Sequence, residues 1–387
     1  MKSIFITVLL LSLSYSQAHA QDDSADSVES GYAFTMVKQL PSTPVKNQYR
    51  TSTCWSFSSI SLLESELMRL GMGEFDLSEM FVVRHVYQGK ADKYVRMHGS
   101  AQLAGGGAFN DVLMVLRNYG MVPESAYPGI AYEEEKHVHG ELDAVIKGYV
   151  DAVVKNRNGR LTPVWVKGLA GILDAYLGEY PAAFSWKGSE QTPRSFADDI
   201  MKLDPADYVL LSSYTHHPFY EQFVLEVPDN WDYGLVYNVP LDQLMATIDH
   251  AIDNGYTVAW ASDVSEKGFD YRKGLAVLPA KEWDDMSKTE KDSVFKYPVP
   301  QKAVTQEMRQ NAFDNYSTTD DHGMHIIGIA TDQNGDRYYY VKNSWGVKRS
   351  RYDGHFYASE AFVACKTMSI MLHKEAIPSA LREKLGL

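Results

Sequence analysis

The sequence contains, at residues 48–58, the stretch Gln48-Tyr49-Arg50-Thr51-Ser52-Thr53-Cys54-Trp55-Ser56-Phe57-Ser58, which places a glutamine six residues before one of only two cysteines. Apolar residues then recur at roughly helical spacing from Trp55 to Leu70, and Gly71 is a typical helix stop. We therefore predict that Cys54 lies at a helix N-terminus, where the helix dipole and the first-turn amides favour a thiolate. Gln48 would then be an amide donor to the oxyanion that forms when a thiolate attacks a carbonyl.

A lone cysteine beside a core helix also has a plainer interpretation, because a free cysteine packs as a small hydrophobe. The role of Cys54 as a nucleophile therefore depends on finding a base elsewhere in the chain. We predict that both cysteines are free thiols, since a disulfide between Cys54 and Cys365 would tie up the nucleophilic sulfur. Cys365 is expected to pack in the core and to carry no chemistry.

A base, and a group that orients it, occur late in the chain. Two β-rich runs at residues 322–330 and 337–343 flank the turn Asn334-Gly335, which predicts a β-hairpin. The start of the first strand of such a hairpin faces the end of the second, so His322 and Asn343 can be neighbours. An imidazole that is held at one nitrogen by an amide oxygen can take a thiol proton at the other. This completes the set of groups that covalent catalysis requires.

The other polar groups predict no second centre. His325, three residues beyond His322, points to the opposite face of the strand. The pair His216-His217 has no partner at convincing ligand spacing, so we predict no metal and no other cofactor. Further helical patterns and one strand-like run occur at 109–119, 141–154, 163–177, 241–254 and 222–227.

Composition limits the class of protein. The 387 residues are 45% hydrophobic, which is enough for one elaborate domain or two. The formal net charge of −13 argues against a nucleic-acid partner, because binding to phosphates needs a basic stripe. No apolar run beyond residue 20 is long enough to span a bilayer, so we expect no stable membrane anchor.

The first 20 residues predict a secretory signal peptide. Met1-Lys2 precedes the apolar run from Ile4 to Leu13, and Ala18-His19-Ala20 is a small-x-small cleavage pattern. No cysteine stands at the cleavage point, so a lipoprotein anchor is not predicted. We expect the mature chain to begin near Gln21 and to be periplasmic or extracellular.

The chain resembles the papain-superfamily cysteine peptidases (peptidase family C1) in several collinear motifs. Besides residues 48–58 these are Leu77-Ser78-Glu79, Gly106-Gly107, Tyr119-Gly120, Tyr127-Pro128, Asp321-His322-Gly323 and Asn343-Ser344-Trp345-Gly346. The resemblance implies that Cys54 is the nucleophile, His322 the general base, Asn343 its orienting residue and Gln48 the oxyanion donor. It further implies that Trp345 covers the hydrogen bond between His322 and Asn343, and that Gly106 and Gly107 line the non-primed substrate cleft.

Within that superfamily, the middle of the chain resembles the bleomycin hydrolase and aminopeptidase C branch. The similar segments are 239–244, 254–258 and 263–264, and Thr51 stands where secreted papain relatives carry a disulfide cysteine. Members of this branch are mostly intracellular, often form hexameric rings, and use their own C-terminal tail to restrict cleavage to amino-terminal residues. The signal peptide and the charged, helical tail at 377–387 depart from that pattern.

The resemblance implies an α+β fold with a mainly helical lobe, a β-rich lobe and the active site between them. We expect one peptidase domain, with the helical lobe at about 44–130, an insertion at about 131–255, the β-rich lobe at about 256–365 and a tail at 366–387. The insertion would decorate the lobes and could serve as an interface in a homo-oligomer.

The function implied is thiol-dependent hydrolysis of peptide substrates through a thioester, by an aminopeptidase. A secreted endopeptidase or an acyl transferase would use the same residues. A peptide-binding homologue without catalytic activity is the alternative from another functional class.

Overall fold

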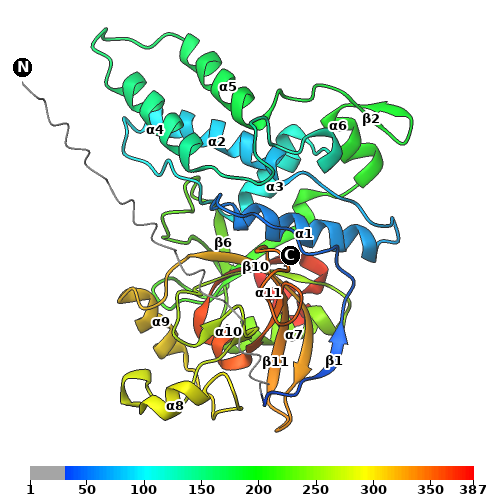
Figure 1. Ribbon diagram of the computed structural model, residues 1–387, viewed down its shortest axis with the longest axis vertical. Coiled ribbons are helices and arrows are strands. Elements are labelled where there is room, and N and C mark those ends of the chain that lie inside the picture. Colours follow the sequence, from blue (N-terminus) through cyan, green and yellow to red (C-terminus); the bar gives the residue numbers. More distant parts are fainter. Residues whose placement is uncertain (1–30) are drawn as a thin grey trace, which may run out of the picture.

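The computed structural model of the protein describes residues 31–387, so the predicted signal peptide lies outside the described residues. Helix α1 (Cys54–Arg69) runs between a helical lobe and a lobe built on one large sheet (Figure 1). Every residue of α1 from Trp55 to Leu67 is buried, so the helix is covered on all of its sides along this length. Among residues 31–387, no helix is both long enough and apolar enough to cross a membrane.

The helical lobe surrounds one apolar core to which α1 contributes. Its longer helices are α2 (Glu79–Arg96), α3 (Phe109–Tyr119), α4 (Gly140–Val154) and α5 (Val164–Leu177). A small hairpin and two short helical segments complete it, namely β2 (Phe184–Trp186), β3 (Ser189–Gln191), α6 (Pro193–Ser195) and a π-helix at Phe196–Met201. The predicted helices at 109–119, 141–154 and 163–177 are therefore confirmed to within a residue at either end.

The second lobe is an eleven-stranded sheet in the order β5-β6-β4-β13-β7-β10-β11-β12-β9-β8, with β1 also paired to β10. Its strands are β1 (Thr35–Gln39), β4 (Tyr208–Ser212), β5 (Gln222–Val224), β6 (Leu235–Asn238), β7 (Val258–Ser262), β8 (Phe269–Asp270), β9 (Leu275–Ala276), β10 (His322–Thr331), β11 (Arg337–Lys342), β12 (His355–Ser359) and β13 (Thr367–His373). The predicted hairpin is the antiparallel pair β10 and β11. Its turn includes Gly335 at a φ of 87°, a conformation that glycine adopts without strain.

Further helices pack around the sheet, and α7, α9, α10 and α8 lie with the sheet in the lower half of Figure 1. They are α7 (Leu241–Asp253), α8 (Lys288–Ser293), α9 (Gln306–Asp314), α10 (Glu360–Lys366) and α11 (Ser379–Leu385). Helix α7 connects β6 to β7 and confirms the helix predicted at 241–254 to within a residue. Cys365 is a buried free thiol in α10, as predicted.

The predicted boundaries within the domain differ from those of the structure. Strands β4 and β6, from the predicted insertion, and β13, from the predicted tail, are members of the main sheet. Helices α4 and α5, also from the predicted insertion, pack on α2 in the helical lobe. The insertion at 131–255 is therefore shared between the two lobes, and the sheet continues to residue 373.

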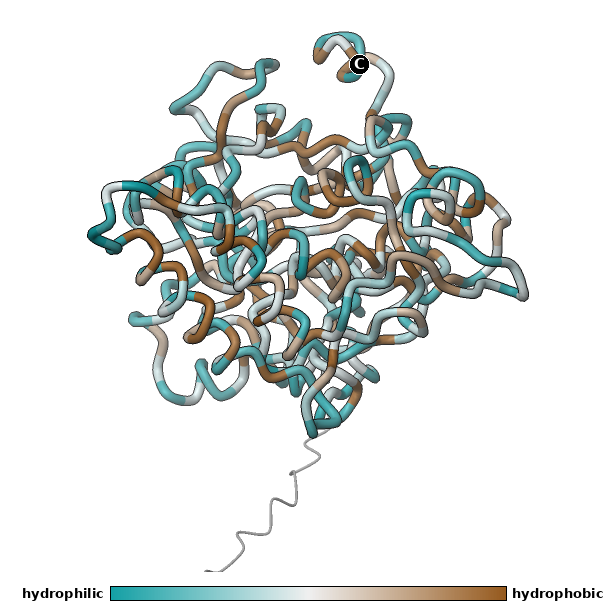
Figure 2. The backbone as a smooth tube through the Cα atoms, turned by 90° about the horizontal axis from the view of Figure 1, so that it is seen from above, coloured by the Kyte–Doolittle hydropathy of each residue, from teal (hydrophilic) through white to brown (hydrophobic). Residues whose placement is uncertain are grey.

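The C-terminal segment packs away from the cleft between the lobes. Leu381 and Leu385 of α11 are buried in the apolar core that also holds α7. The ring Nδ1 of His250 in α7 lies 2.9 Å from the carbonyl oxygen of Ala376. In Figure 2 the C-terminus lies at the periphery of the molecule. The same view shows hydrophilic segments at the outer turns of the chain.

Candidate active site

Cys54 is the first residue of α1, and the side chain of the preceding Thr53 makes no capping hydrogen bond to the helix. The amides of Ser56 and Phe57 donate to the Thr53 carbonyl, whereas the backbone N–H groups of Trp55 and Gly323 donate to the Cys54 thiol. Burial raises the pKa of this thiol to about 12, the Gly323 amide lowers it, and the carboxylates of Asp320 and Asp229 raise it. A thiolate at this position therefore needs a cation that forms beside it.

His322 begins β10, and Asn343 directly follows β11. The two side chains are 4% and 2% exposed, and the ring Nε2 lies 2.7 Å from the amide Oδ1 of Asn343. The same Oδ1 accepts a 2.7 Å hydrogen bond from the backbone N–H of Ser344, which fixes the amide with its oxygen toward the ring. Nε2 of His322 therefore carries a proton, and Nδ1 is the nitrogen left to accept one.

The strand that carries His322 approaches the start of α1 very closely. A Cβ atom at Gly323 would lie 2.8 Å from the Ser58 hydroxyl and 3.2 Å from the Cα of Trp55, so only glycine fits there without a shift. Cys54, His322 and Gly323 consequently line one pocket of about 40 Å³. The structure thus brings together the predicted nucleophile and base, which lie 268 residues apart in the sequence.

Burial of His322 lowers the pKa of its imidazole to about 4, while the hydrogen bond to Asn343 raises it. The surroundings thus disfavour an isolated charge on either member of the pair. Proton transfer from the thiol to the ring creates two opposite charges side by side, and each then offsets the cost of burying the other.

Trp345 covers the imidazole. Its ring stacks on that of His322 with centroids 4.5 Å apart and planes inclined by 27°. Tyr271 and Phe269 pack edge-on against Trp345, with centroids 5.1 Å and 6.1 Å away. These rings form an apolar cover beside the hydrogen bond between His322 and Asn343, which is the position that the resemblance implies for Trp345.

Gln48 is buried and held by Ser344. Its backbone N–H donates to the Ser344 carbonyl at 2.8 Å, and its side-chain Oε1 accepts from the Ser344 hydroxyl at 2.6 Å. The Nε2 donors of Gln48 have no hydrogen-bond partner among residues 31–387, so they remain available for a substrate oxygen. Ser344 therefore orients both Gln48 and Asn343. The only sequence signal for this role is that Ser344 directly follows Asn343.

The glycine loop before α3 forms another wall of the site. Gly107 lines the pocket, and a Cβ there would lie 2.7 Å from the Trp55 ring. A Cβ at Gly106 would lie 2.0 Å from the Asp229 carboxylate. Gly106 itself does not line the pocket. It contacts Asp229, and Asp229 lines the pocket. The loop is further fixed by a 3.2 Å hydrogen bond from Trp55 Nε1 to the Gly105 carbonyl.

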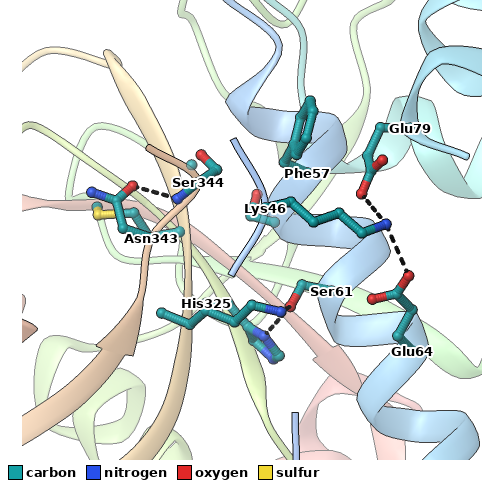
Figure 3. Close-up of a pocket in the computed structure, with 12 residues that line it drawn as sticks. Lys46, Phe57, Ser61, Glu64, Glu79, His325, Asn343 and Ser344 are labelled. Carbon is teal, nitrogen blue, oxygen red and sulfur yellow. Dashed lines mark hydrogen bonds and ion pairs between the residues drawn. The ribbon is translucent and has the colours of Figure 1, made fainter. Parts of the chain in front are cut away.

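Two lysines make polar contacts near His322 and Asn343, and one of them connects the two lobes. The Lys46 ammonium lies 2.8 Å from Glu79 and 3.3 Å from Glu64, and Figure 3 shows it between these carboxylates. The Lys342 ammonium, at the end of β11, donates to Ser61 of α1 at 2.7 Å. Since Lys342 precedes Asn343, this bond fixes the orienting amide relative to the helix that begins at Cys54.

The other histidines singled out in the sequence, His325 and His216-His217, are not part of the His322–Asn343 pair. His325 is buried with Nδ1 2.9 Å from the Ser61 hydroxyl, away from Cys54, as predicted. The sequence spacing predicts no carboxylate partner for His216-His217, but in the structure Glu226 lies 3.0 Å and 2.6 Å from their rings. That expectation was wrong because Glu226 reaches both rings from the strand-and-loop segment that follows Phe219.

The arrangement around His216 nevertheless favours a hydrogen bond over a metal ligand. The amide oxygen of Gln310 accepts from the Thr215 N–H, so its Nε2 faces the ring Nδ1 of His216 at 3.0 Å. Nδ1 is then an acceptor and Nε2 carries the proton that points to Glu226. Metal binding at Nε2 would require the opposite tautomer.

Comparison with known proteins shows the family to which the chain belongs. A sequence model of the Peptidase C1-like family matches residues 183–386, which include His322 and Asn343. Aminopeptidase G of Lactobacillus delbrueckii subsp. lactis is 21% identical, over 90% of this chain and 85% of the relative. Aminopeptidase C of Listeria monocytogenes is 22% identical, over 89% and 83%.

Two further matches extend to a eukaryotic relative and to a solved structure. The mitochondrial cysteine proteinase 1 of Saccharomyces cerevisiae is 22% identical, over 91% of this chain and 79% of the relative. The crystal structure of PepW from Lactobacillus rhamnosis HN001 superposes with a TM-score of 0.70 at 18% identity, over 91% of this chain and 84% of the other, which shows the fold. The chain belongs to the Peptidase C1-like family and is a papain-superfamily cysteine peptidase of the aminopeptidase C branch.

Proposed function

We propose that this cysteine peptidase uses Cys54 as its nucleophile and acts on peptides from their free amino terminus. The observation that carries the assignment is the His322–Asn343 hydrogen bond of 2.7 Å, in the same pocket as a cysteine at a helix N-terminus. Relatives named Aminopeptidase C and Aminopeptidase G, each aligned over about nine-tenths of the chain, support the choice of aminopeptidase.

In the proposed mechanism, the Cys54 thiol gives its proton to Nδ1 of His322 as the sulfur attacks the scissile carbonyl carbon. The carbonyl oxygen becomes an anion, which accepts hydrogen bonds from the Cys54 backbone N–H and from Nε2 of Gln48. The C–N bond then breaks, and the His322 imidazolium protonates the leaving amine, which leaves a thioester on Cys54.

The second half of the reaction uses the same groups in reverse. Nδ1 of His322 takes a proton from a water molecule, whose oxygen attacks the thioester carbonyl. Collapse of the resulting oxyanion breaks the C–S bond, and the sulfur regains its proton from His322. Asn343 keeps the His322 ring oriented in both halves of the reaction. Trp345 restricts the access of water to the hydrogen bond between His322 and Asn343.

A pair of fluorogenic amides tests the aminopeptidase assignment. Leucyl-aminomethylcoumarin and its N-acetyl form differ only in the charge and size of the amino terminus. We expect kcat/KM to be at least about tenfold higher for the free amine, since one charge-assisted contact supplies that much discrimination. Cys54→Ala is the control for contaminating activity with both substrates. Equal rates, or a preference for the acetylated substrate, would instead indicate an endopeptidase.

We further propose that the protein is exported. The supporting features are the basic Met1-Lys2 start, the apolar run from Ile4 to Leu13, and the small residues around His19. A C-terminally tagged chain should be recovered outside the cytoplasm with a new amino terminus near Gln21. Recovery in the cytoplasm with residues 1–20 still attached would contradict export.

A further inference from the structure

Two aspartates of the pocket, Asp320 and Asp229, raise the pKa of the Cys54 thiol but make no contact in the mechanism above. Asp320 lies two residues before His322, in the segment that leads into β10, and Asp229 lies between β5 and β6. Both side chains are half-buried and line the same pocket as Cys54 and His322. They approach that pocket from segments 91 residues apart in the sequence.

Asp320 and Asp229 differ from the neighbouring Asp321 in how many hydrogen bonds their carboxylates accept from the protein. The Asp321 carboxylate accepts from the backbone N–H groups of Val264 and Ser265, at 2.9 Å and 3.0 Å. Asp320 makes no hydrogen bond or ion pair with any residue of the described part of the chain. Asp229 has only the amide of Gln102, at a long 3.5 Å.

The nearby Lys90 is not in direct contact with either carboxylate, although the charge of Asp229 raises the pKa of Lys90 against the larger effect of burial. The ammonium of Lys90 donates to the carbonyl oxygens of Ala104 and Gly106, beneath the glycine loop. It makes no ion pair with Asp229 or Asp320 within residues 31–387. Burial and, after it, the charges of Asp229, Asp321 and Asp263 together raise the pKa of Asp320 to about 7. A half-buried carboxyl group in this setting lacks a compensating cation.

The shape of the pocket limits which cation can reach these carboxylates. Its other walls include the apolar side chains of Phe109, Leu210, Leu225, Val227 and Val236. Gly106 contacts the Asp229 carboxylate, so a peptide lying along the glycine loop passes directly beside it. A narrow pocket with apolar walls and two carboxylates suits an ammonium group carried on a short or apolar stem.

We propose that Asp320 and Asp229 form a subsite for a cationic group on the acyl side of the scissile bond. The substrates of the enzyme are then peptides whose residue before that bond carries a free α-ammonium, or in which a basic side chain lies one residue further back. This inference rests on the proposed peptidase function and names the substrate class of that same site.

Three fluorogenic substrates and three variants test the subsite. The substrates are leucyl-aminomethylcoumarin, which carries an α-ammonium, acetyl-lysyl-alanyl-aminomethylcoumarin, which carries a basic side chain, and acetyl-leucyl-alanyl-aminomethylcoumarin, which is neutral. The variants of the full chain are Asp320→Asn, Asp229→Asn and, as the matched control, Asp232→Asn. Asp232 lies in the same segment as Asp229 but pairs with Lys93 at 3.2 Å and does not line the pocket.

We expect Asp320→Asn and Asp229→Asn each to lower kcat/KM at least about tenfold for one cationic substrate and less than about threefold for the neutral one. Loss with the first substrate assigns the subsite to the α-ammonium, and loss with the second assigns it to a basic side chain. Asp232→Asn should change none of the three rates. An equal effect on all three substrates, or no effect, overturns the proposal.

A binding measurement keeps the subsite testable apart from catalysis. Calorimetry with leucinamide, lysinamide and N-acetyl-leucinamide on the Cys54→Ala chain should show that one of the cationic amides binds more tightly than the neutral acetylated one. Asp320→Asn in the same background should remove that preference. Absence of hydrolysis by the wild-type chain would defeat the proposed function, whereas equal binding of all three amides would defeat the subsite.

Discussion

The proton on His322 is directed by residues that do not touch a substrate. Ser344 donates its backbone N–H to Asn343 and its hydroxyl to Gln48, so one residue sets the orientation of two amides. Asn343 in turn leaves Nδ1 of His322 as the acceptor. Because the surroundings of Cys54 and His322 disfavour isolated charges, the ion pair forms only when the proton passes directly between them.

This pairing predicts a broad pH profile of kcat/KM. Protonation of His322 removes the base, so activity falls as the pH drops through the lower apparent pKa of the pair. Burial lowers the pKa of His322 from 6.5 to about 4 and raises that of Cys54 above 9.0, so the two limbs move apart. With the neutral substrate acetyl-leucyl-alanyl-aminomethylcoumarin, we expect an acidic limb well below pH 6.5 and a basic limb above pH 9.

The acidic limb should be measured together with the reversibility of any loss, by returning samples to pH 7 before the assay. This control separates protonation from acid unfolding. An acidic limb at or above pH 6.5 would contradict the environment described for His322.

At the residue scale, the sequence singles out the proposed catalytic groups because each lies in a recognisable local context, a helix start for Cys54 and the two ends of a hairpin for His322 and Asn343. The same reasoning could not find Asp229 or Asp320. A single aspartate in a loop is typical of any surface, and only the fold shows that these two share a pocket in which neither is paired with a cation.

Among the elements, those with one buried face were the predictable ones. Helices α3 and α7 each bury a stripe of apolar residues, so their periodicity is visible in the sequence. Strands β4 and β13 are buried along nearly their whole length in the middle of the sheet, so they lack the alternation that marks a strand. The sequence pattern therefore does not identify β4 and β13 as strands of the main sheet.

The contact between β11 and α1 is the element-scale feature on which the site depends. The Lys342 ammonium donates to Ser61 at 2.7 Å and to Thr43 at 3.0 Å, and all three residues are buried. Lys342→Met removes two charge-assisted hydrogen bonds between the lobes, while Ser61 keeps His325 and Thr43 keeps Glu64 as hydrogen-bond partners. The loss should lower the free energy of unfolding by about 2–4 kcal/mol. Urea denaturation of the purified chain measures the change.

The same variant should lower kcat because Asn343 follows Lys342 directly. Lys348→Met is the matched control, since Lys348 is exposed in the loop after β11. A change in stability below about 0.5 kcal/mol, the level of ordinary surface substitutions, would show that this contact does not hold the lobes in register.

On the scale of the whole molecule, the site exists only where the lobes meet. The core of the helical lobe also includes Ala259 and Ala261 of β7 and Met368 and Met371 of β13, so the two lobes are packed as one body. The resemblance to papain-like enzymes predicted this two-lobed α+β architecture. It could not predict how the chain divides between the lobes, because residues of the predicted insertion pair with strands more than 100 residues away.

The most direct test of the central claim compares the two cysteines as catalytic groups in the intact chain. Hydrolysis of leucyl-aminomethylcoumarin is measured for the wild type, Cys54→Ala and Cys365→Ala, with circular dichroism as the check on folding. We expect Cys54→Ala to lower kcat/KM at least about 10³-fold, as loss of the nucleophile does in related mechanisms. Cys365→Ala should retain most of the activity, and hydrolysis by a folded Cys54→Ala chain at a rate close to that of the wild type would contradict the account.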